Sequence, residues 1–109
     1  YAGAFPTWLA PVQAKVIPIS ESQHTYANEV IKHLKDANIR TEGDFRNETM
    51  GFKIREAQLA KTPYMLILGK RELASKTASV RKRTGEDLGE KSLEQVLALI
   101  QEEAQSRRN

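Results

Sequence analysis

The chain has 109 residues, of which 39% are hydrophobic and 28% are charged, and its formal net charge is +3. This composition is typical of one folded domain and excludes a disordered or collagen-like chain. The sequence has no cysteine, which excludes disulfides, thiolate metal sites and a cysteine nucleophile. Its longest apolar run, residues 64–68, is far shorter than the ~20 residues of a membrane span. We therefore expect a cytoplasmic protein with no membrane segment.

The first thirteen residues differ from the rest, because Pro6 and Pro11 interrupt any helix there. We expect residues 1–13 to be an extended connector and residues 14–109 to be the folded domain. The chain begins at Tyr1 instead of methionine, so we also expect it to be a piece of a longer protein.

The spacing of apolar residues then predicts alternating strands and helices. Strands are expected at residues 14–20, 39–45, 64–68 and 77–83, helices at 20–37, 50–61 and from 92 onward, a turn or short helical piece at 70–76, and a loop at 84–91. Ser20 with Gln23, and Ser92 with Gln95, have the spacing of a helix-capping box. This order predicts an α/β domain with a largely parallel sheet.

The positive charge is concentrated in the middle of the chain. Residues 46–83 contain ten bases and three acids, whereas residues 1–45 and 84–109 are net acidic. A basic segment of this kind favours a polyanionic partner, and nucleic acid is the first candidate. The alternative is a solvated surface with no specific partner.

Catalytic chemistry is poorly supplied. Residues 85–92 superficially resemble a phosphate-binding loop, but their glycine spacing is wrong and their acids repel phosphate. Ser92 fits a helix cap better. His24 and His33 lie outside any recognisable nucleophile context, and we expect both to be ordinary surface residues.

Recognition chemistry is better supplied. Open α/β sheets bind ligands at the carboxyl ends of their strands. We expect Asn47, Glu72 and Arg81 to approach one such rim, Arg81 being carried there by the strand at 77–83. Amide, carboxylate and guanidinium groups suit the base edges that single-stranded RNA exposes. Phe45 and Phe52 can stack on bases, although aromatic residues at such positions more often belong to the core.

Five short motifs occur in the order and spacing of a known family. They are FPTWLAPVQ (5–13), RNE (46–48), GFKIREA (51–57), PYM (63–65) and SVRKR (79–83). Over essentially the whole chain they resemble the C-terminal anticodon-binding domain of threonyl-tRNA synthetases, a class II family. Prolyl-, glycyl- and histidyl-tRNA synthetases carry related domains. The resemblance implies a five-stranded mixed sheet with three main helices.

The resemblance also implies a parent threonine–tRNA ligase. Such an enzyme is a homodimer that uses ATP and Mg²⁺, and catalysis belongs to an upstream class II domain with a zinc site that selects threonine. Residues 1–13 would be the end of the connector from that domain. This chain would then recognise tRNA(Thr) through its anticodon loop, with no catalytic, cofactor or metal site of its own.

Threonine codons begin with AC, so every threonine anticodon has a middle G and a final U. The resemblance implies that Asn47 reads the final U, that Glu72 and Arg81 belong to the base-reading groups, and that Arg55 supports RNA contacts. We assign Arg81 to the middle G, because arginine matches the acceptor edge of guanine. Glu72 can read either base, or pair internally with Arg71 or Arg81. Further RNA backbone contacts are expected at Arg46, Thr49, Lys53, Lys70, Arg71 and Arg83.

Two positions depart from the family pattern. The family often has lysine where this chain has Thr49, which removes a cationic donor beside Asn47. It often has Gly-Asp-Lys-Glu where this chain has Gly-Lys-Arg-Glu at residues 69–72. The added charge favours phosphate contact without adding specificity.

Two other functions remain open. A non-catalytic accessory or paralogous protein can use the same domain for another RNA or for a protein partner. The coding sequence upstream distinguishes this case, because a ligase has a class II catalytic domain there in frame. A small α/β enzyme with a nucleotide site is the third hypothesis, and the absence of a phosphate-binding glycine loop argues against it.

Overall fold

The computed structural model describes residues 12–105, so residues 1–11 of the predicted connector lie outside the described part. In chain order the elements are β1 (Ala14–Pro18), the 3-10 turn η2 (Glu21–Gln23), α1 (His24–Asp36), β2 (Thr41–Gly43), α2 (Met50–Leu59), β3 (Tyr64–Leu68), α3 (Lys70–Ser75), β4 (Thr77–Lys82), β5 (Asp87–Ser92) and α4 (Leu93–Gln105). The predicted cap of the last helix is confirmed. The backbone N–H of Ser92 donates to Gln95 Oε1 (3.0 Å), and the Gln95 N–H donates to Ser92 Oγ (3.2 Å).

The strands form one sheet in the order β2-β1-β3-β4-β5. β1 pairs in parallel with β2 and β3, and β4 and β5 continue the sheet antiparallel. The predicted α/β domain with a five-stranded mixed sheet and a parallel core is confirmed. The loop expected at residues 84–91 was wrong in part, because residues 87–92 form β5. This edge strand has no buried residue, so its sequence lacks the apolar alternation that marks a half-buried strand.

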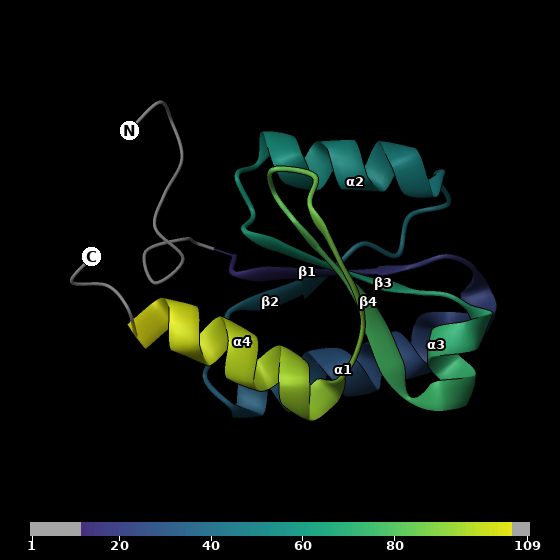
Figure 1. The fold of residues 1–109 in the computed structure, drawn as a ribbon. Coiled ribbons are helices and arrows are strands. Elements are labelled where there is room, and N and C mark those ends of the chain that lie inside the picture. The colour runs from purple at the N-terminus through teal and green to yellow at the C-terminus, as the bar shows by residue number, and fades with distance from the viewer. Residues whose placement is uncertain (1–11, 106–109) are drawn as a thin grey trace.

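Helices cover both faces of the sheet (Figure 1). α1 and α4 pack on one face, where the main core includes Val16, Leu66 and Val80. α2 packs on the other, where a smaller core contains Ile17, Ile54, Ala57, Met65 and Ile67. This second core draws its strand residues from β1 and β3. Ser79 and Arg81 of β4 pair with Ile67 and Met65 of this core and are themselves partly buried.

Candidate nucleic-acid interface

The loop from β2 to α2 places Asn47 at the carboxyl edge of the parallel strands. β1, β2 and β3 run in parallel, so the residues that follow Pro18, Gly43 and Leu68 lie along one edge. Asn47 is exposed there and borders a small hollow of about 60 Å³ that also includes Ile19 and Phe45. This is the position expected for Asn47 from the sequence.

Two carboxylates hold Arg46 beside Asn47. Asp44 accepts hydrogen bonds from Arg46 Nε (2.9 Å) and Nη2 (2.7 Å), and Glu56 of α2 lies 2.9 Å from the same Nη2. Its guanidinium also lies 5.3 Å from the centre of the Phe52 ring. The hydrogen bonds from Arg46 hold the pKa of Asp44 below its usual value, and those to Asp44 and Glu56 raise the pKa of Arg46. Much of the donor capacity of Arg46 therefore serves the loop itself.

Lys53 lies inside the protein, although the sequence predicted an RNA contact for it. Its side chain comes from α2 and only 3% of the residue is exposed. The ammonium donates to the backbone carbonyls of Pro18 (3.3 Å) and Asp44 (3.1 Å). The expected backbone contact is corrected accordingly, because a buried ammonium that joins the ends of β1 and β2 does not present its charge to a phosphate.

Thr49 begins α2. Its Oγ1 accepts a hydrogen bond from the backbone N–H of Phe52 (3.2 Å), as expected of an N-cap residue. The departure from lysine at this position thus gives the helix a cap while it removes a cation. Asn47 therefore lies between Arg46, which two carboxylates bind, and the capped N-terminus of α2.

Two aromatic residues flank this loop at the surface. Phe45 is 36% exposed and Phe52 is 41% exposed, so neither belongs to the core that was the more frequent alternative. The ring of Phe45 contacts His24 edge to face, with 5.0 Å between the centroids. Exposed aromatic faces beside Asn47 are suited to stacking on unpaired bases.

Glu72 occupies the first turn of α3 and is largely buried. Its Oε1 accepts from the backbone N–H of Gly69 (2.8 Å) and its Oε2 accepts from the hydroxyl of Ser79 on β4 (2.9 Å). Arg71 Nε lies 3.9 Å from Oε2. Burial opposes ionisation, but these hydrogen bonds outweigh it and hold the pKa of Glu72 below its usual value. Glu72 is a fixed carboxylate that faces β4.

Arg81 lies on the same sheet face as Ser79, because alternate residues of a strand share a face. Its pairing partner on β3 is Met65, which belongs to the smaller core under α2. The Nε of Arg81 is buried and has no hydrogen-bond partner in the part of the chain that the structure describes. Its Nη2 lies 3.8 Å from Asp87 of β5. A buried donor without a partner is energetically unfavourable unless water or a bound acceptor pairs with it.

The predicted common rim needs one correction. β4 runs antiparallel to β3, so its carboxyl end points away from the edge that carries Asn47. Arg81 lies two residues, about 7 Å, farther from that edge than Ser79. Arg83 lies farther still, and its backbone N–H donates to Pro63 before β3. The candidate interface therefore continues from the edge onto the face of β4.

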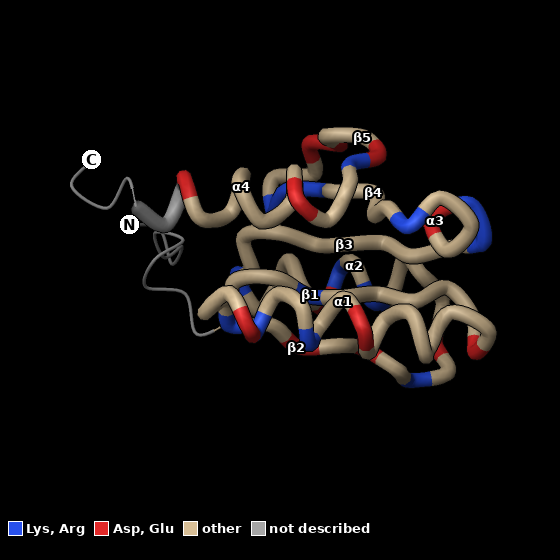
Figure 2. The backbone as a smooth tube through the Cα atoms, turned by 90° about the horizontal axis from the view of Figure 1, so that it is seen from below, with Lys and Arg blue, Asp and Glu red and all other residues tan. Residues whose placement is uncertain are grey.

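The remaining predicted cations lie at the surface. Arg55 is exposed on α2, and Lys70 and Arg71 are exposed in the first turn of α3. Two acidic residues of β5, which follows the basic segment 46–83 in the sequence, lie close to arginines of that segment. Glu90 approaches Arg71 (3.8 Å) and Asp87 approaches Arg81, and Figure 2 shows acidic positions on β5 beside basic positions on β4. The surface is mixed in charge, which favours oriented contacts over uniform phosphate binding.

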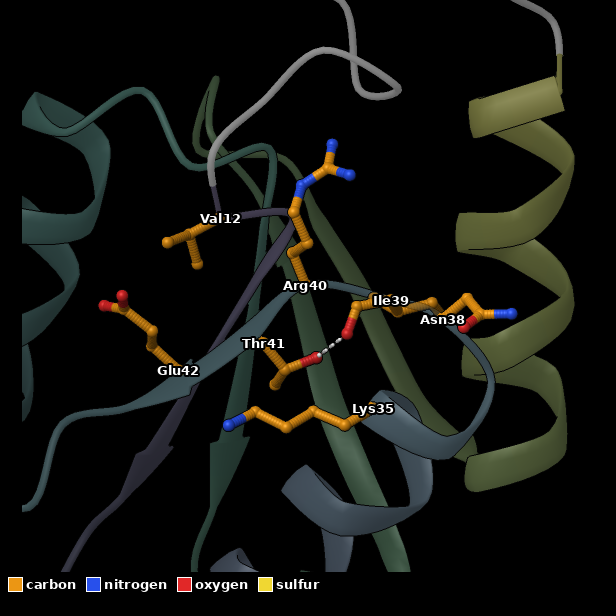
Figure 3. A pocket seen from close by; sticks show the side chains of 7 residues that line it. All are labelled: Val12, Lys35, Asn38, Ile39, Arg40, Thr41 and Glu42. Carbon is orange, nitrogen blue, oxygen red and sulfur yellow. Dashed lines mark hydrogen bonds between the residues drawn. The ribbon is translucent and has the colours of Figure 1, made fainter.

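A larger hollow of about 600 Å³ lies at the opposite end of the strands (Figure 3). It is lined by Val12, Lys35, Asn38, Ile39, Arg40, Thr41 and Glu42. Between two of these lining residues, the hydroxyl of Thr41 donates to the carbonyl of Ile39 (2.9 Å). This hollow borders the amino ends of β1 and β2 and is separate from the predicted site residues.

Two further features bear on function. Within residues 12–105, no group of three His, Cys, Asp or Glu side chains is placed to hold a metal ion. Within the same range, no helix has the length and apolarity needed to cross a membrane.

Residues 13–103 match the family described as anticodon binding domain. The chain belongs to this family. It is 50% identical over 109 residues to a threonine–tRNA ligase of Acetivibrio thermocellus and 53% identical over 109 residues to one of Clostridium botulinum. These matches cover all of this chain and 17% of each relative. The chain therefore spans about one sixth of the length of the curated relatives it matches.

Solved structures agree with this assignment. The RNA-binding domain of threonyl-tRNA synthetase from Cryptosporidium parvum has a TM-score of 0.87 and 34% identity, over 93% of this chain and 26% of that chain. Prolyl-tRNA synthetase from the same organism has a TM-score of 0.82 and 26% identity, over 94% of this chain and 23% of that chain. The resemblance predicted from the five motifs is confirmed.

Proposed function

We propose that this chain reads the anticodon of tRNA(Thr), with its middle G and final U, as the C-terminal domain of a threonine–tRNA ligase. The observation that carries the proposal is the position of Arg81 on β4, where its side chain is one third exposed and its Nε has no hydrogen-bond partner in the described residues. Asn47 and Glu72, at the edge of the same sheet, add an amide and a carboxylate. β2 and β4 are three strand spacings apart, about 14 Å, and Arg81 is also set back along β4 from the edge that carries Asn47, so the two side chains face separate bases.

Each side chain matches one kind of base edge. The Asn47 amide can accept from N3–H of the final U and donate to a neighbouring carbonyl of that base. Arg81 donates to O6 and N7 of the middle G. A carboxylate has about four acceptor positions, and Glu72 uses one on each oxygen within the protein. It retains capacity to accept from guanine N1–H or N2–H. Arg55, Lys70 and Arg71 supply the backbone contacts.

The proposal extends to the parent protein. It would be a homodimeric ligase in the cytoplasm, with its catalytic domain upstream in the same chain, that charges the recognised tRNA with threonine. ATP, Mg²⁺ and Zn²⁺ belong to that catalytic domain. The donor set in the described residues does not fit a metal site, and no step of base recognition proposed for this chain passes through one.

The test is Asn47→Ala, measured as affinity for a threonine anticodon stem-loop with U or C at the final anticodon position. The unmodified chain is expected to favour U, and the variant to lose roughly tenfold of that preference, as for one good base-reading pair. Asn28→Ala is the matched control, since Asn28 is exposed on α1, across the sheet. If Asn47→Ala and Asn28→Ala keep the same preference for U, Asn47 does not read this base.

A further inference from the structure

Next to Arg81 of β4, the neighbouring strand β5 has one extra residue that pairs with no residue of β4. Val80 pairs with Gly89, and Arg81 pairs with Asp87, so the register skips Leu88. Gly89 has φ +84°, in the left-handed region that glycine adopts without strain. An extra residue next to a glycine of this conformation is a β-bulge, a feature that redirects side chains near functional sites.

The bulge decides which residue faces Arg81. Without it, the next residue after Gly89 in the pairing would be Leu88, and an apolar side chain would lie opposite the guanidinium. With it, Leu88 packs against the main core on the other face. Asp87 takes the position opposite Arg81, where cross-strand neighbours are close enough to interact.

The carboxylate of Asp87 is itself anchored. Its Oδ1 accepts a hydrogen bond from the backbone N–H of Gly89 (2.9 Å), and its Oδ2 lies 3.8 Å from Arg81 Nη2. The contact involves one end of the guanidinium and leaves Nε without a partner in the described part of the chain. Asp87 thus places a negative charge beside one end of the guanidinium, at a distance longer than a hydrogen bond.

We propose that Asp87, set in place by the Gly89 bulge, is a positioning residue that increases the base specificity of Arg81 and lowers its affinity for RNA in general. The inference rests on the proposed function of Arg81 as a base reader. An anionic group beside the guanidinium repels a phosphate, the sequence-independent ligand. The neutral edge of a base accepts from the guanidinium without this repulsion, so the acidic neighbour favours a base over a phosphate.

The test is Asp87→Asn, compared with the unmodified chain for binding to threonine anticodon stem-loops with G or A at the middle position. The variant is expected to bind the A-containing RNA more tightly and to lose about threefold of its preference for G, within the range of exposed ion pairs. Glu86→Gln is the matched control, because it removes the same charge from an exposed neighbouring residue. It is expected to strengthen both complexes equally and to leave the preference unchanged.

A second variant tests the bulge without a change of charge. Gly89→Ala places a Cβ at φ +84° and is expected to shift Asp87 and lower the preference for G. If Asp87→Asn behaves like Glu86→Gln, or weakens both complexes with an unchanged preference, the inference is wrong. If the unmodified chain shows no preference for G, the proposed function fails instead. Because Asp87→Asn keeps the strand backbone intact, it decides the matter even where Gly89→Ala fails to fold.

Discussion

Replacing Arg81 with alanine is expected to weaken binding of a threonine anticodon stem-loop by about 1–3 kcal/mol and to abolish the preference for a middle G. Arg81 is the group whose Nε is buried without a partner in the described residues, two residues along β4 from Ser79, which binds the carboxylate of Glu72. The alanine variant removes both the donors that match guanine O6 and N7 and the unsatisfied group itself. The measurement is a binding titration against stem-loops with G and with A, at one moderate salt concentration.

Arg83→Ala is the matched control for this prediction. Arg83 follows β4 and is half-buried, and its backbone is held by Pro63. We expect it to contribute at most a phosphate contact, so its loss weakens both complexes alike and keeps the preference. Uniform weakening by Arg81→Ala as well would reduce Arg81 to a phosphate contact.

Replacing Lys53 with methionine is expected to lower the free energy of unfolding by about 3 kcal/mol. The change removes the ammonium that binds the carbonyls of Pro18 and Asp44, and each buried carbonyl left unpaired costs roughly 1–3 kcal/mol. Methionine fills a similar volume, so the loss reports the hydrogen bonds more than the packing. Urea unfolding followed by circular dichroism measures it.

The same variant separates two roles for Lys53. A residue that orders the Asn47 loop affects the preference for a final U, while the salt dependence of binding stays the same. Lys70→Met is the control: Lys70 is exposed in α3, so its loss should leave stability nearly unchanged. If Lys70 contacts a phosphate, Lys70→Met also reduces the steepness of log affinity against log salt concentration by about 0.7. A stable Lys53→Met protein with a reduced slope would contradict the buried position of this ammonium.

The sequence predicted most elements because their apolar residues are buried on one or both faces. β3 is buried throughout and α1 buries one stripe, so each has a clear period. β5 lacks this signal. It is an edge strand of partly exposed residues, interrupted by a bulge at Gly89. The direction of β4 was also missed, because residue spacing alone does not distinguish a parallel from an antiparallel neighbour.

The sequence proposed the residues of the candidate site but not their arrangement. The family motifs pointed to Asn47, Glu72 and Arg81, and in the structure Glu72 of α3 binds Ser79, which shares a face of β4 with Arg81. The burial of Lys53 was not predictable, because a lysine in a basic segment is usually exposed. The acids that approach Arg71 and Arg81 come from β5, so the local charge depends on a pairing that the linear pattern does not reveal.

The most direct test of the central claim is the affinity of the unmodified chain for a threonine anticodon stem-loop and for the same RNA with its middle G changed to A. Both are measured at one moderate salt concentration, because phosphate contacts make affinity strongly salt-dependent. The account predicts a preference for G of roughly tenfold, as expected for one good base-reading pair. Equal affinity for the two RNAs would mean that the basic groups hold the backbone alone, and would contradict base readout by this domain.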